Sequence, residues 1–187
     1  METNENKKRC HWCNLNNPLY VHYHDYEWGK LDLRENYLFE MLILEMFQAG
    51  LSWECVLNKR GAFRKAYEGF VPSKVASFSE EKIASLCSNK DIIRNKRKIL
   101  ASVENSKIFL SIEVEYASFS AYLMTFTGGK IMKETESTSS SLSDAISLDL
   151  RKRGMKYVGT KVVYSFLQAV GIINSHDDDC YLANSEN

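Results

Sequence analysis

The sequence predicts an all-α fold in a single domain. Residues 35–48 have the length of a helix and consist largely of good helix formers. The alternation of β-branched and polar residues that marks a half-buried strand does not persist between turn residues anywhere in the chain. A length of 187 residues, 44% of them hydrophobic, is sufficient for a well-buried core. We therefore expect helices packed against helices.

The first strongly predicted helix runs from Glu35 to about Gln48. It is apolar on nearly every side, so we expect it at the centre of the domain. Gly50 is the expected end of this segment, and Ser52 can cap a second helix that begins at Trp53.

Three more helices are expected in the middle of the chain. A Ser-Glu-Glu run at residues 79–81 is a typical start for a short helix that reaches Cys87. A longer helix is expected from Asp91 towards Leu110. Residues 119–126 then form a further apolar helical segment.

A helix-hairpin-helix is predicted over about residues 144–171. It follows residues 127–143, which are rich in Gly, Ser and Thr and predict a mobile loop inside one domain. Ser143 and Asp144 have the chemistry of a helix start.

The first helix of this hairpin closes with basic residues 151–153 followed by Gly154, which is typical helix-end chemistry. The second helix spans residues 162–170 and stops at Gly171. A turn of six residues, Gly-Met-Lys-Tyr-Val-Gly, separates the two helices.

This turn has the chemistry of a phosphate-binding site. Gly159 allows the backbone to approach an anion closely, and the free amides from Thr160 onward would point at it. Lys156 and Lys161 add positive charge nearby. A purely structural helical turn explains the glycines equally well, so the residues alone leave both interpretations open.

Overall charge gives no support for a nucleic-acid partner. The formal net charge is zero and the isoelectric point is near 6.9, whereas nucleic-acid binders usually carry a basic surface. Basic runs occur at residues 94–98 and 151–153, and acidic runs at residues 134–136 and 177–179. A solvated surface explains such runs without any partner.

The ends of the chain differ from the domain between them. Residues 1–9 are polar and charged without a hydrophobic segment, so we expect a disordered leader and not a secretory signal. Residues 10–182 form the predicted domain, and residues 183–187 a tail. No apolar stretch approaches the roughly 20 residues needed to cross a bilayer. We expect a cytoplasmic protein, or a nuclear one in a eukaryote.

The cysteine count is odd, which argues against a disulfide framework. The five cysteines are Cys10, Cys13, Cys55, Cys87 and Cys180. Cys10 and His24 near the start, with His176 and Cys180 near the end, supply two thiolates and two imidazoles, as a closed zinc site requires. Other sets remain possible, since Cys13 lies at ligand spacing from Cys10 and two further histidines, His11 and His22, are close in sequence.

With these residues in view, the sequence resembles the 3-methyladenine DNA glycosylase I family, a branch of the helix-hairpin-helix glycosylase superfamily. The match extends in order from Cys10 to Cys180, and so covers nearly the whole chain. The matching stretches are residues 9–12, 23–29, 38–41, 44–45, 48–53, 92–94, 98–99, 153–160, 165–169 and 174–176, with Gly171 and Cys180.

The resemblance implies a structural zinc ion that joins the two ends of the chain. The ligands would be Cys10, His24, His176 and Cys180, which match the family's ligand positions. Cys13 is outside the family pattern and could compete for the metal. The acidic residues 177–179 lie where other superfamily members place a catalytic Asp, but this branch lacks that Asp, so we assign them to the zinc loop.

Glu45 is the most informative single residue. On a helical wheel its neighbours are Met41, Leu42, Gln48 and Ala49, so its carboxylate would point into a mostly apolar face. A buried charge is costly unless it is paired, and a cationic purine would pair it. The resemblance implies that Glu45 contacts the methylated base. An exposed carboxylate or a structural cap is the alternative.

The resemblance also implies the walls of the base pocket and the DNA contacts. Tyr23 and Trp53 would form the walls with Trp12 nearby, whereas for Trp28 we expect ordinary core packing. The DNA-binding residues would be Gly154, Gly159, Thr160 and Lys161, with Gly50 and Leu51 as a wedge that fills the gap left in the duplex.

The implied function is monofunctional excision of 3-methyladenine from double-stranded DNA by base flipping, carried out by a monomer. Two alternatives remain. One is a non-catalytic helix-hairpin-helix module that grips DNA, and the other is a zinc-stabilised protein-interaction domain.

Overall fold

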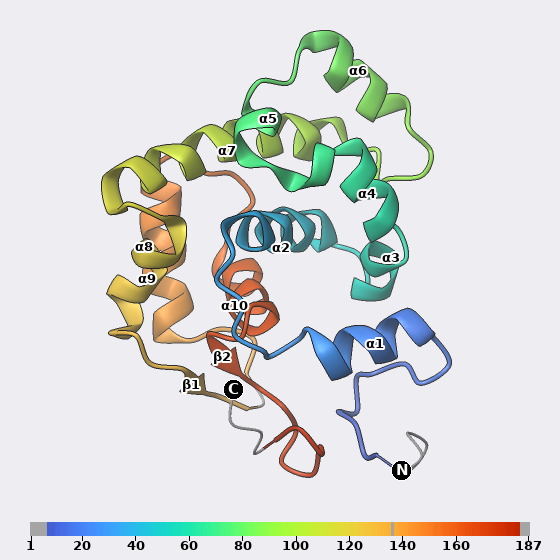
Figure 1. Ribbon diagram of the computed structural model, residues 1–187, viewed down its shortest axis with the longest axis vertical. Coiled ribbons are helices and arrows are strands. Elements are labelled where there is room, and N and C mark those ends of the chain that lie inside the picture. Colours follow the sequence, from blue (N-terminus) through green and yellow to red (C-terminus); the bar gives the residue numbers. More distant parts are fainter. Residues whose placement is uncertain (1–6, 136, 184–187) are drawn as a thin grey trace.

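The computed structural model describes residues 7–135 and 137–183, and it is built mostly of helices (Figure 1). The predicted leader up to residue 6 and the tail from residue 184 lie outside the described residues. The elements in chain order are α1 (Pro18–Tyr26), α2 (Glu35–Gln48), α3 (Trp53–Leu57), α4 (Arg60–Ala66), η2 (Glu68–Phe70), α5 (Pro72–Ala76), α6 (Glu80–Ser88), α7 (Lys96–Tyr116), α8 (Phe119–Thr127), β1 (Met132–Lys133), α9 (Ser141–Lys152), α10 (Thr160–Ala169) and β2 (Ile173–Asn174).

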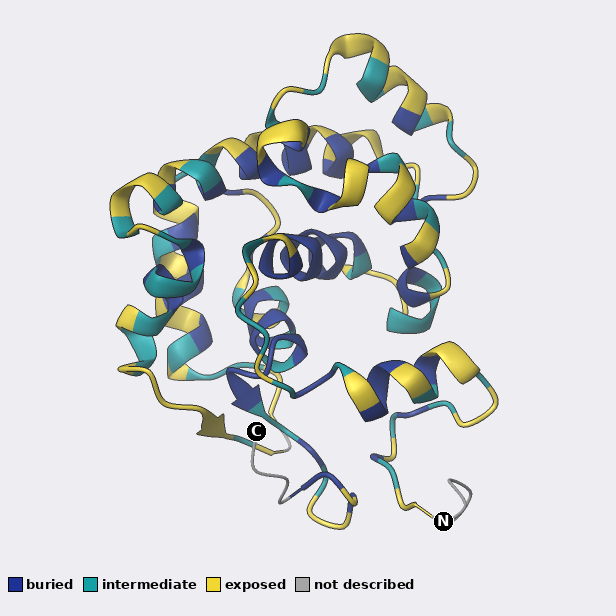
Figure 2. Cartoon of the chain, viewed as in Figure 1, coloured by how far each residue is buried: buried dark blue, intermediate teal, exposed yellow. Residues whose placement is uncertain are grey.

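Helix α2 lies at the centre of the domain, as the sequence predicts. Every residue from Tyr37 to Phe47 is buried, and the helix is dark on all sides in Figure 2. It contacts α7, α8 and η2 as well as α3 and α10. Because it is enclosed on all sides, any side chain on α2 that is not apolar must meet a partner or a cavity.

Two predicted helix starts are confirmed by their caps. Ser52 caps α3 by accepting a hydrogen bond from the Cys55 amide at 3.3 Å. Ser79 caps α6 in the same way, accepting from the Lys82 amide at 3.3 Å. In both helices the side chain satisfies an amide that has no partner within the helix.

Two other predicted starts are wrong. Helix α7 begins at Lys96 and not at Asp91, because Asn95 caps the amides of Arg97 and Lys98 at 3.1 and 3.2 Å. It also continues past Leu110 to Tyr116.

Helix α9 begins at Ser141, three residues before the expected boundary at residue 144. The cap is Ser140, whose hydroxyl accepts from the Ser143 amide at 3.4 Å. The Ser143 hydroxyl in turn accepts from the Ser140 amide at 2.8 Å. Ser143 is therefore the third residue of the helix and the second partner of a capping box, not the cap itself.

Some elements were not predicted from the sequence. Helix α1 starts with Pro18 after Asn17, whose side chain accepts from the Leu19 amide at 3.0 Å. Helices α4 and α5 were also missed. Strand β1 lies inside the segment expected to be only a loop and pairs in parallel with β2 over two residues each. A pair this short has no side-chain pattern that a sequence could show.

Gly171, just after α10, allows the loop that follows α1 to pass very close to the end of α10. Its φ is +77°, and a Cβ atom there would lie 2.2 Å from the carbonyl carbon of Lys30. The loop after α1 is bonded to the end of α10 on either side of this contact, through Gly29 to Gln168 at 3.1 Å and Asp32 to Val170 at 3.1 Å. Only glycine permits so close an approach, which holds α1 against α10.

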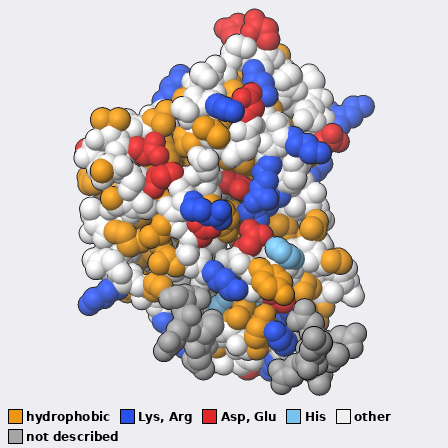
Figure 3. All heavy atoms as spheres, in the orientation of Figure 1, with side chains coloured by type: hydrophobic (Ala, Val, Ile, Leu, Met, Phe, Trp, Pro, Cys, Tyr) orange, Lys and Arg blue, Asp and Glu red, His pale blue; other side chains and the backbone are white. Residues whose placement is uncertain are grey.

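The surface agrees with the neutral composition. On the face shown in Figure 3, acidic and basic side chains are interspersed, without a large area of one sign. Among the described residues, no helix combines the length and hydrophobicity that a membrane crossing would need.

Candidate active site and metal centre

A cavity of about 270 Å³ opens between α1, α2, α3 and α10. It lies close to the range of about 300–1,000 Å³ that is typical of small-molecule sites. Its lining includes the four residues predicted to contact the base, Glu45, Tyr23, Trp53 and Trp12. The full lining is His11, Trp12, Tyr20, Tyr23, Trp28, Glu45, Gln48, Trp53, Ser137, Ser165, Gln168, Ser175 and Asp177.

The cavity walls are largely aromatic. The rings of Tyr23 and Trp53 lie 5.2 Å apart at 42°. Trp12 packs edge-on against Trp28 at 4.6 Å, and Trp28 also contacts the ring of His176 at 4.7 Å. Trp28 is therefore a core residue, as expected, and a wall of the cavity as well. Such walls suit a flat ring with positive charge.

Two polar atoms on the aromatic side chains of these walls have no hydrogen-bond partner among the described residues. The hydroxyl of Tyr23 and the indole Nε1 of Trp53 are buried without a hydrogen bond to any described residue. An unpaired buried polar group costs about 1–3 kcal/mol, so such groups usually have a ligand or water as partner. Their position around the cavity favours a polar ligand.

Glu45 is buried, with 4% of its surface exposed, and lines the cavity. Among the described residues no hydrogen bond or ion pair reaches its carboxylate. Glu40, on the same helix, is by contrast held by Arg60 at 2.7 Å and Arg64 at 2.7 Å. Burial raises the pKa of Glu45 to about 8. Both alternatives considered for Glu45, an exposed carboxylate and a structural cap, are wrong.

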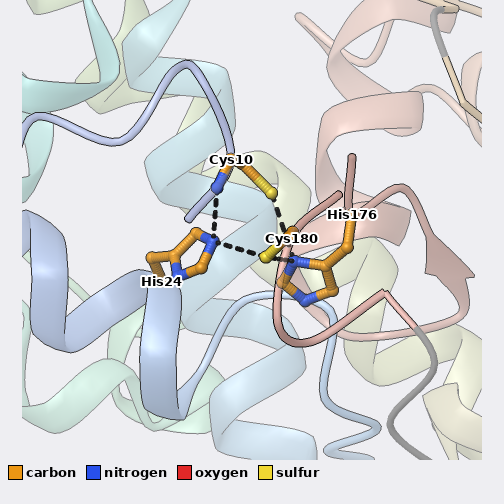
Figure 4. Close-up of side chains that lie close together, drawn as sticks. All are labelled: Cys10, His24, His176 and Cys180. Atoms are coloured by element: carbon orange, nitrogen blue, oxygen red, sulfur yellow. Dashed lines mark hydrogen bonds between the residues drawn. The ribbon is translucent and has the colours of Figure 1, made fainter. Parts of the chain in front are cut away.

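The structure brings Cys10, His24, His176 and Cys180 together from the two ends of the chain (Figure 4). All four are buried, and their candidate ligand atoms lie within 4.8 Å of one another. Sulfur–nitrogen separations are 3.3 Å from Cys10 to His176, 3.5 Å from Cys180 to His24 and 3.7 Å from Cys180 to His176. In a tetrahedral zinc site, a cysteine sulfur and a histidine nitrogen that bind the same ion lie about 3.6 Å apart.

A second layer of contacts orients His24. Its Nδ1 lies 2.9 Å from the Asp25 carboxylate, which leaves Nε2 facing the Cys180 sulfur and the backbone amide of Cys10. Arg9 donates to both oxygens of Asp25, at 2.8 and 2.7 Å. Burial alone would raise the pKa of Asp25, but the bonds from Arg9 and His24 lower it to about 2. Arg9 therefore belongs to the domain, although the sequence analysis placed it in the disordered leader.

The protonation states suit a cation. Burial lowers the pKa of His176 to about 4 and also lowers that of His24, so both imidazoles are neutral ligands. Burial raises the pKa of the Cys10 thiol. A bound cation would reverse that effect and stabilise the thiolate, so these residues could hold a metal ion.

The competing ligands are occupied elsewhere. The Cys13 thiol points to the carbonyl of Tyr20 at 3.9 Å and is outside the cluster. His11 binds the Asp177 carboxylate at 2.9 Å, and His22 is exposed, 3.7 Å from Glu27. Asp177 also accepts from the His11 amide at 2.6 Å, so this carboxylate joins the two ends of the chain although it borders the cavity.

Helices α9 and α10 are joined by residues 153–159. Gly154 has a φ of +102°, directly after the last turn of α9. Gly159 is the N-cap of α10, and among the described residues no atom lies within 4 Å of the place where a Cβ atom would be. This is the geometry that an anion site at a helix N-terminus needs.

A second hollow of about 420 Å³ adjoins the cavity and shares four lining residues with it, Gln48, Ser137, Ser165 and Gln168. Gly50, Leu51 and Lys161 line this hollow. The structure thus brings these three residues into the hollow beside the cavity, whereas Gly154, Gly159 and Thr160 lie outside both linings.

Sequence reasoning missed several residues of the cavity, among them Tyr20, Gln48, Ser165 and Gln168. Tyr20 precedes Tyr23 by three residues, so both lie on one face of α1. The Asn-Pro pair before that helix could have revealed it. The polar residues on α10 carried no distinguishing signal.

Known proteins resemble this chain over most of its length. The family model of methyladenine glycosylase matches residues 12–183. DNA-3-methyladenine glycosylase 1 of Escherichia coli is 41% identical and covers 92% of this chain and 95% of its own. A crystal structure of 3-methyladenine DNA glycosylase I superposes with a TM-score of 0.88 at 39% identity, covering 93% of this chain and 98% of that one. A variant of 3-methyladenine DNA glycosylase I, solved in complex with 3-methyladenine, superposes with a TM-score of 0.87 at 33% identity. The match covers 91% of this chain and 95% of that one.

Proposed function

This chain belongs to the methyladenine glycosylase family, and from that membership we propose that it excises 3-methyladenine from alkylated DNA by hydrolysing the N-glycosidic bond. The observation that carries the proposal is the unpaired carboxylate of Glu45, buried in an aromatic cavity.

The chemistry follows from the charge of the substrate. Methylation at N3 makes adenine cationic and weakens its bond to the sugar, so the enzyme needs recognition more than a strong acid. An ionised Glu45 inside a cavity of low polarity attracts such a cation strongly, and it attracts neutral adenine much less. Tyr23 and Trp53 stack on the ring and offer their unpaired polar atoms to it.

Hydrolysis by water fits the cavity better than covalent catalysis. No lysine is present among the described residues that line it, so there is no amine to form a Schiff base with the sugar. This supports a monofunctional enzyme.

The protein would act as a monomer on double-stranded DNA. A base in a duplex cannot reach an enclosed cavity, so the nucleotide must be flipped out. The helix-hairpin-helix formed by α9 and α10 would grip a backbone phosphate through the amides at Gly159 and Thr160, with Lys161 adding charge. Gly154 shapes the turn. Gly50 and Leu51, in the hollow beside the cavity, would fill the gap in the duplex.

The four-residue cluster would hold a structural zinc ion. Cys10, His24, His176 and Cys180 supply four ligands, which leaves no open position for water or substrate. The sulfur–nitrogen separations support this assignment. The ion would join the two chain ends and stabilise the fold without taking part in the reaction.

The test is an excision assay with methylated duplex DNA under single-turnover conditions, with identification of the released base. Wild-type protein should release 3-methyladenine. Glu45→Gln should slow release by about 100-fold or more, since it removes the charge that pairs with the cation. The matched control Glu104→Gln changes an exposed carboxylate on α7 and should have no effect.

The alternative, a non-catalytic DNA-binding module, predicts a different result in that assay. Such a module would bind undamaged and methylated duplexes equally and release no base. Its hairpin explains phosphate binding, but it gives no role to the carboxylate of Glu45.

A further inference from the structure

Asn105 of α7 holds the turn of the hairpin by two hydrogen bonds. Its carboxamide oxygen accepts from the Lys156 amide at 2.8 Å, and its Nδ2 donates to the Lys156 carbonyl at 2.9 Å. Nδ2 also lies 3.6 Å from the sulfur of Met46, the residue after Glu45 on α2. Asn105 itself is fully buried, so these contacts account for its polar atoms.

Lys98, which also lies on α7, holds a second segment of the chain. Its ammonium group donates to the carbonyls of Phe47 at 2.9 Å and Ala49 at 2.7 Å, at the end of α2. Only 6% of Lys98 is exposed. Its positive charge lies at the C-terminus of α2, where the helix dipole makes a cation favourable. The two residues that follow Ala49, Gly50 and Leu51, line the hollow that adjoins the cavity.

These two contacts lie on one face of α7. Lys98 and Asn105 are seven residues apart, which is about two helical turns. Each directs its polar atoms to the main chain of a neighbouring segment. In the described structure the charged Lys98 forms no ion pair with an acidic side chain.

The turn that Asn105 holds is strained. Tyr157, next to Lys156, has a φ of +57°, a conformation that bulky residues rarely adopt. Such a conformation persists only where surrounding contacts enforce it. The bidentate contact of Asn105 with the preceding residue is one such contact.

We propose that Lys98 and Asn105 are positioning residues that use α7 as a spacer between the phosphate-binding hairpin and the loop beside the base cavity. The inference rests on the proposed function. A flipped nucleotide must reach the cavity while its backbone is held at the hairpin, so the separation of the two segments determines whether the base is seated correctly. A displacement of about 1 Å can cost about 100-fold in rate.

The test compares excision from methylated duplex DNA with binding of free 3-methyladenine. Asn105→Asp keeps the size and the acceptor but loses the donor to the Lys156 carbonyl. Lys98→Met keeps the apolar stem but loses both bonds. We expect kcat/KM for excision to fall about 10-fold or more in each, with the Kd of the free base within about twofold of wild type. The control Ser106→Ala removes a buried hydroxyl that bonds only within α7, at 2.7 Å to Val103, and should change neither quantity.

Hydrogen exchange separates this inference from the proposed function. Amides at residues 156–160 should exchange faster in Asn105→Asp, and those at residues 49–52 in Lys98→Met, whether or not the protein excises a base. A wild type that releases no base would refute the function alone. Unchanged exchange in the held segments, or equal losses in free-base affinity and excision, would overturn the inference.

Discussion

Tyr23 and His24 are consecutive residues of α1, yet their side chains belong to two different sites. The ring of Tyr23 packs 5.2 Å from Trp53 in the wall of the cavity, while Nε2 of His24 lies 3.5 Å from the sulfur of Cys180. A residue at one site cannot shift without moving its neighbour at the other. The cluster that joins the chain ends therefore also fixes one wall of the base cavity.

From the proposed zinc site it follows that removal of the metal should weaken base binding as well as the fold. Chelation, or Cys180→Ser, should lower the free energy of unfolding by roughly 3–5 kcal/mol. The affinity for free 3-methyladenine should fall with it, because Tyr23 loses its anchor. Added Zn²⁺ should restore the chelated wild type but not the variant. Cys87→Ser, outside the cluster, is the control. Equal base affinity with and without metal would contradict the coupling.

Excision should depend on the ionisation of Glu45. Because burial raises its pKa to about 8, the fraction of ionised carboxylate increases from pH 6 to pH 9. The enzyme-dependent kcat/KM should increase over that range, reach half of its maximum near pH 8 and level off above about pH 9. Glu45→Gln should give a low, flat profile. A flat profile in the wild type would show that the charge of Glu45 does not control the reaction.

The same group should make the wild type less stable at high pH. The pKa of Glu45 is raised in the folded protein from an ordinary value of 4.5 to about 8, so the folded state binds the proton more tightly. Stability should therefore fall between pH 4.5 and pH 8. Glu45→Gln should be more stable than wild type by about 4 kcal/mol at pH 8, with little difference at pH 4.5. Denaturant unfolding at both pH values measures this, and an equal difference at both would contradict it.

Gly171→Ala should be strongly destabilising. The new Cβ would lie 2.2 Å from the Lys30 carbonyl carbon at a φ of +77°, so both sterics and backbone conformation oppose it. We expect a loss of at least about 3 kcal/mol in the free energy of unfolding. Gly61→Ala, in α4 with nothing within 4 Å, should instead be neutral or stabilising by up to about 1 kcal/mol. Similar stabilities for the two variants would disprove the close contact.

Lys161→Gln should reduce DNA affinity and its salt dependence together. Lys161 is exposed at the start of α10 and lines the hollow next to the cavity. Loss of one phosphate contact should lower the slope of log K against log salt by about 0.9, without changing the affinity for the free base. The control Lys107→Gln removes an exposed lysine that pairs with Glu104. An unchanged slope for Lys161→Gln would exclude the contact.

The sequence determined the helical class, the central helix and the functional family. These follow from local information, since the run at residues 35–48 is apolar all round and caps such as Ser52 act within a few residues. It also singled out Glu45 as a carboxylate on a mostly apolar face, and the structure shows it buried in the lining of the cavity. Where two nearby side chains could cap the same helix, as Ser140 and Ser143 could, local chemistry did not decide between them.

The tertiary structure alone decided which residues meet. The sequence offered several ligand sets for one metal, and folding brings Cys10 and Cys180 to the same pair of imidazoles while Cys13 turns away. The structure likewise shows that Arg60 pairs with Glu40, whereas no described residue pairs with Glu45, although both carboxylates lie on one buried helix. These outcomes depend on contacts between residues far apart in the chain, which are made only when the helices pack and so leave no local pattern in the sequence.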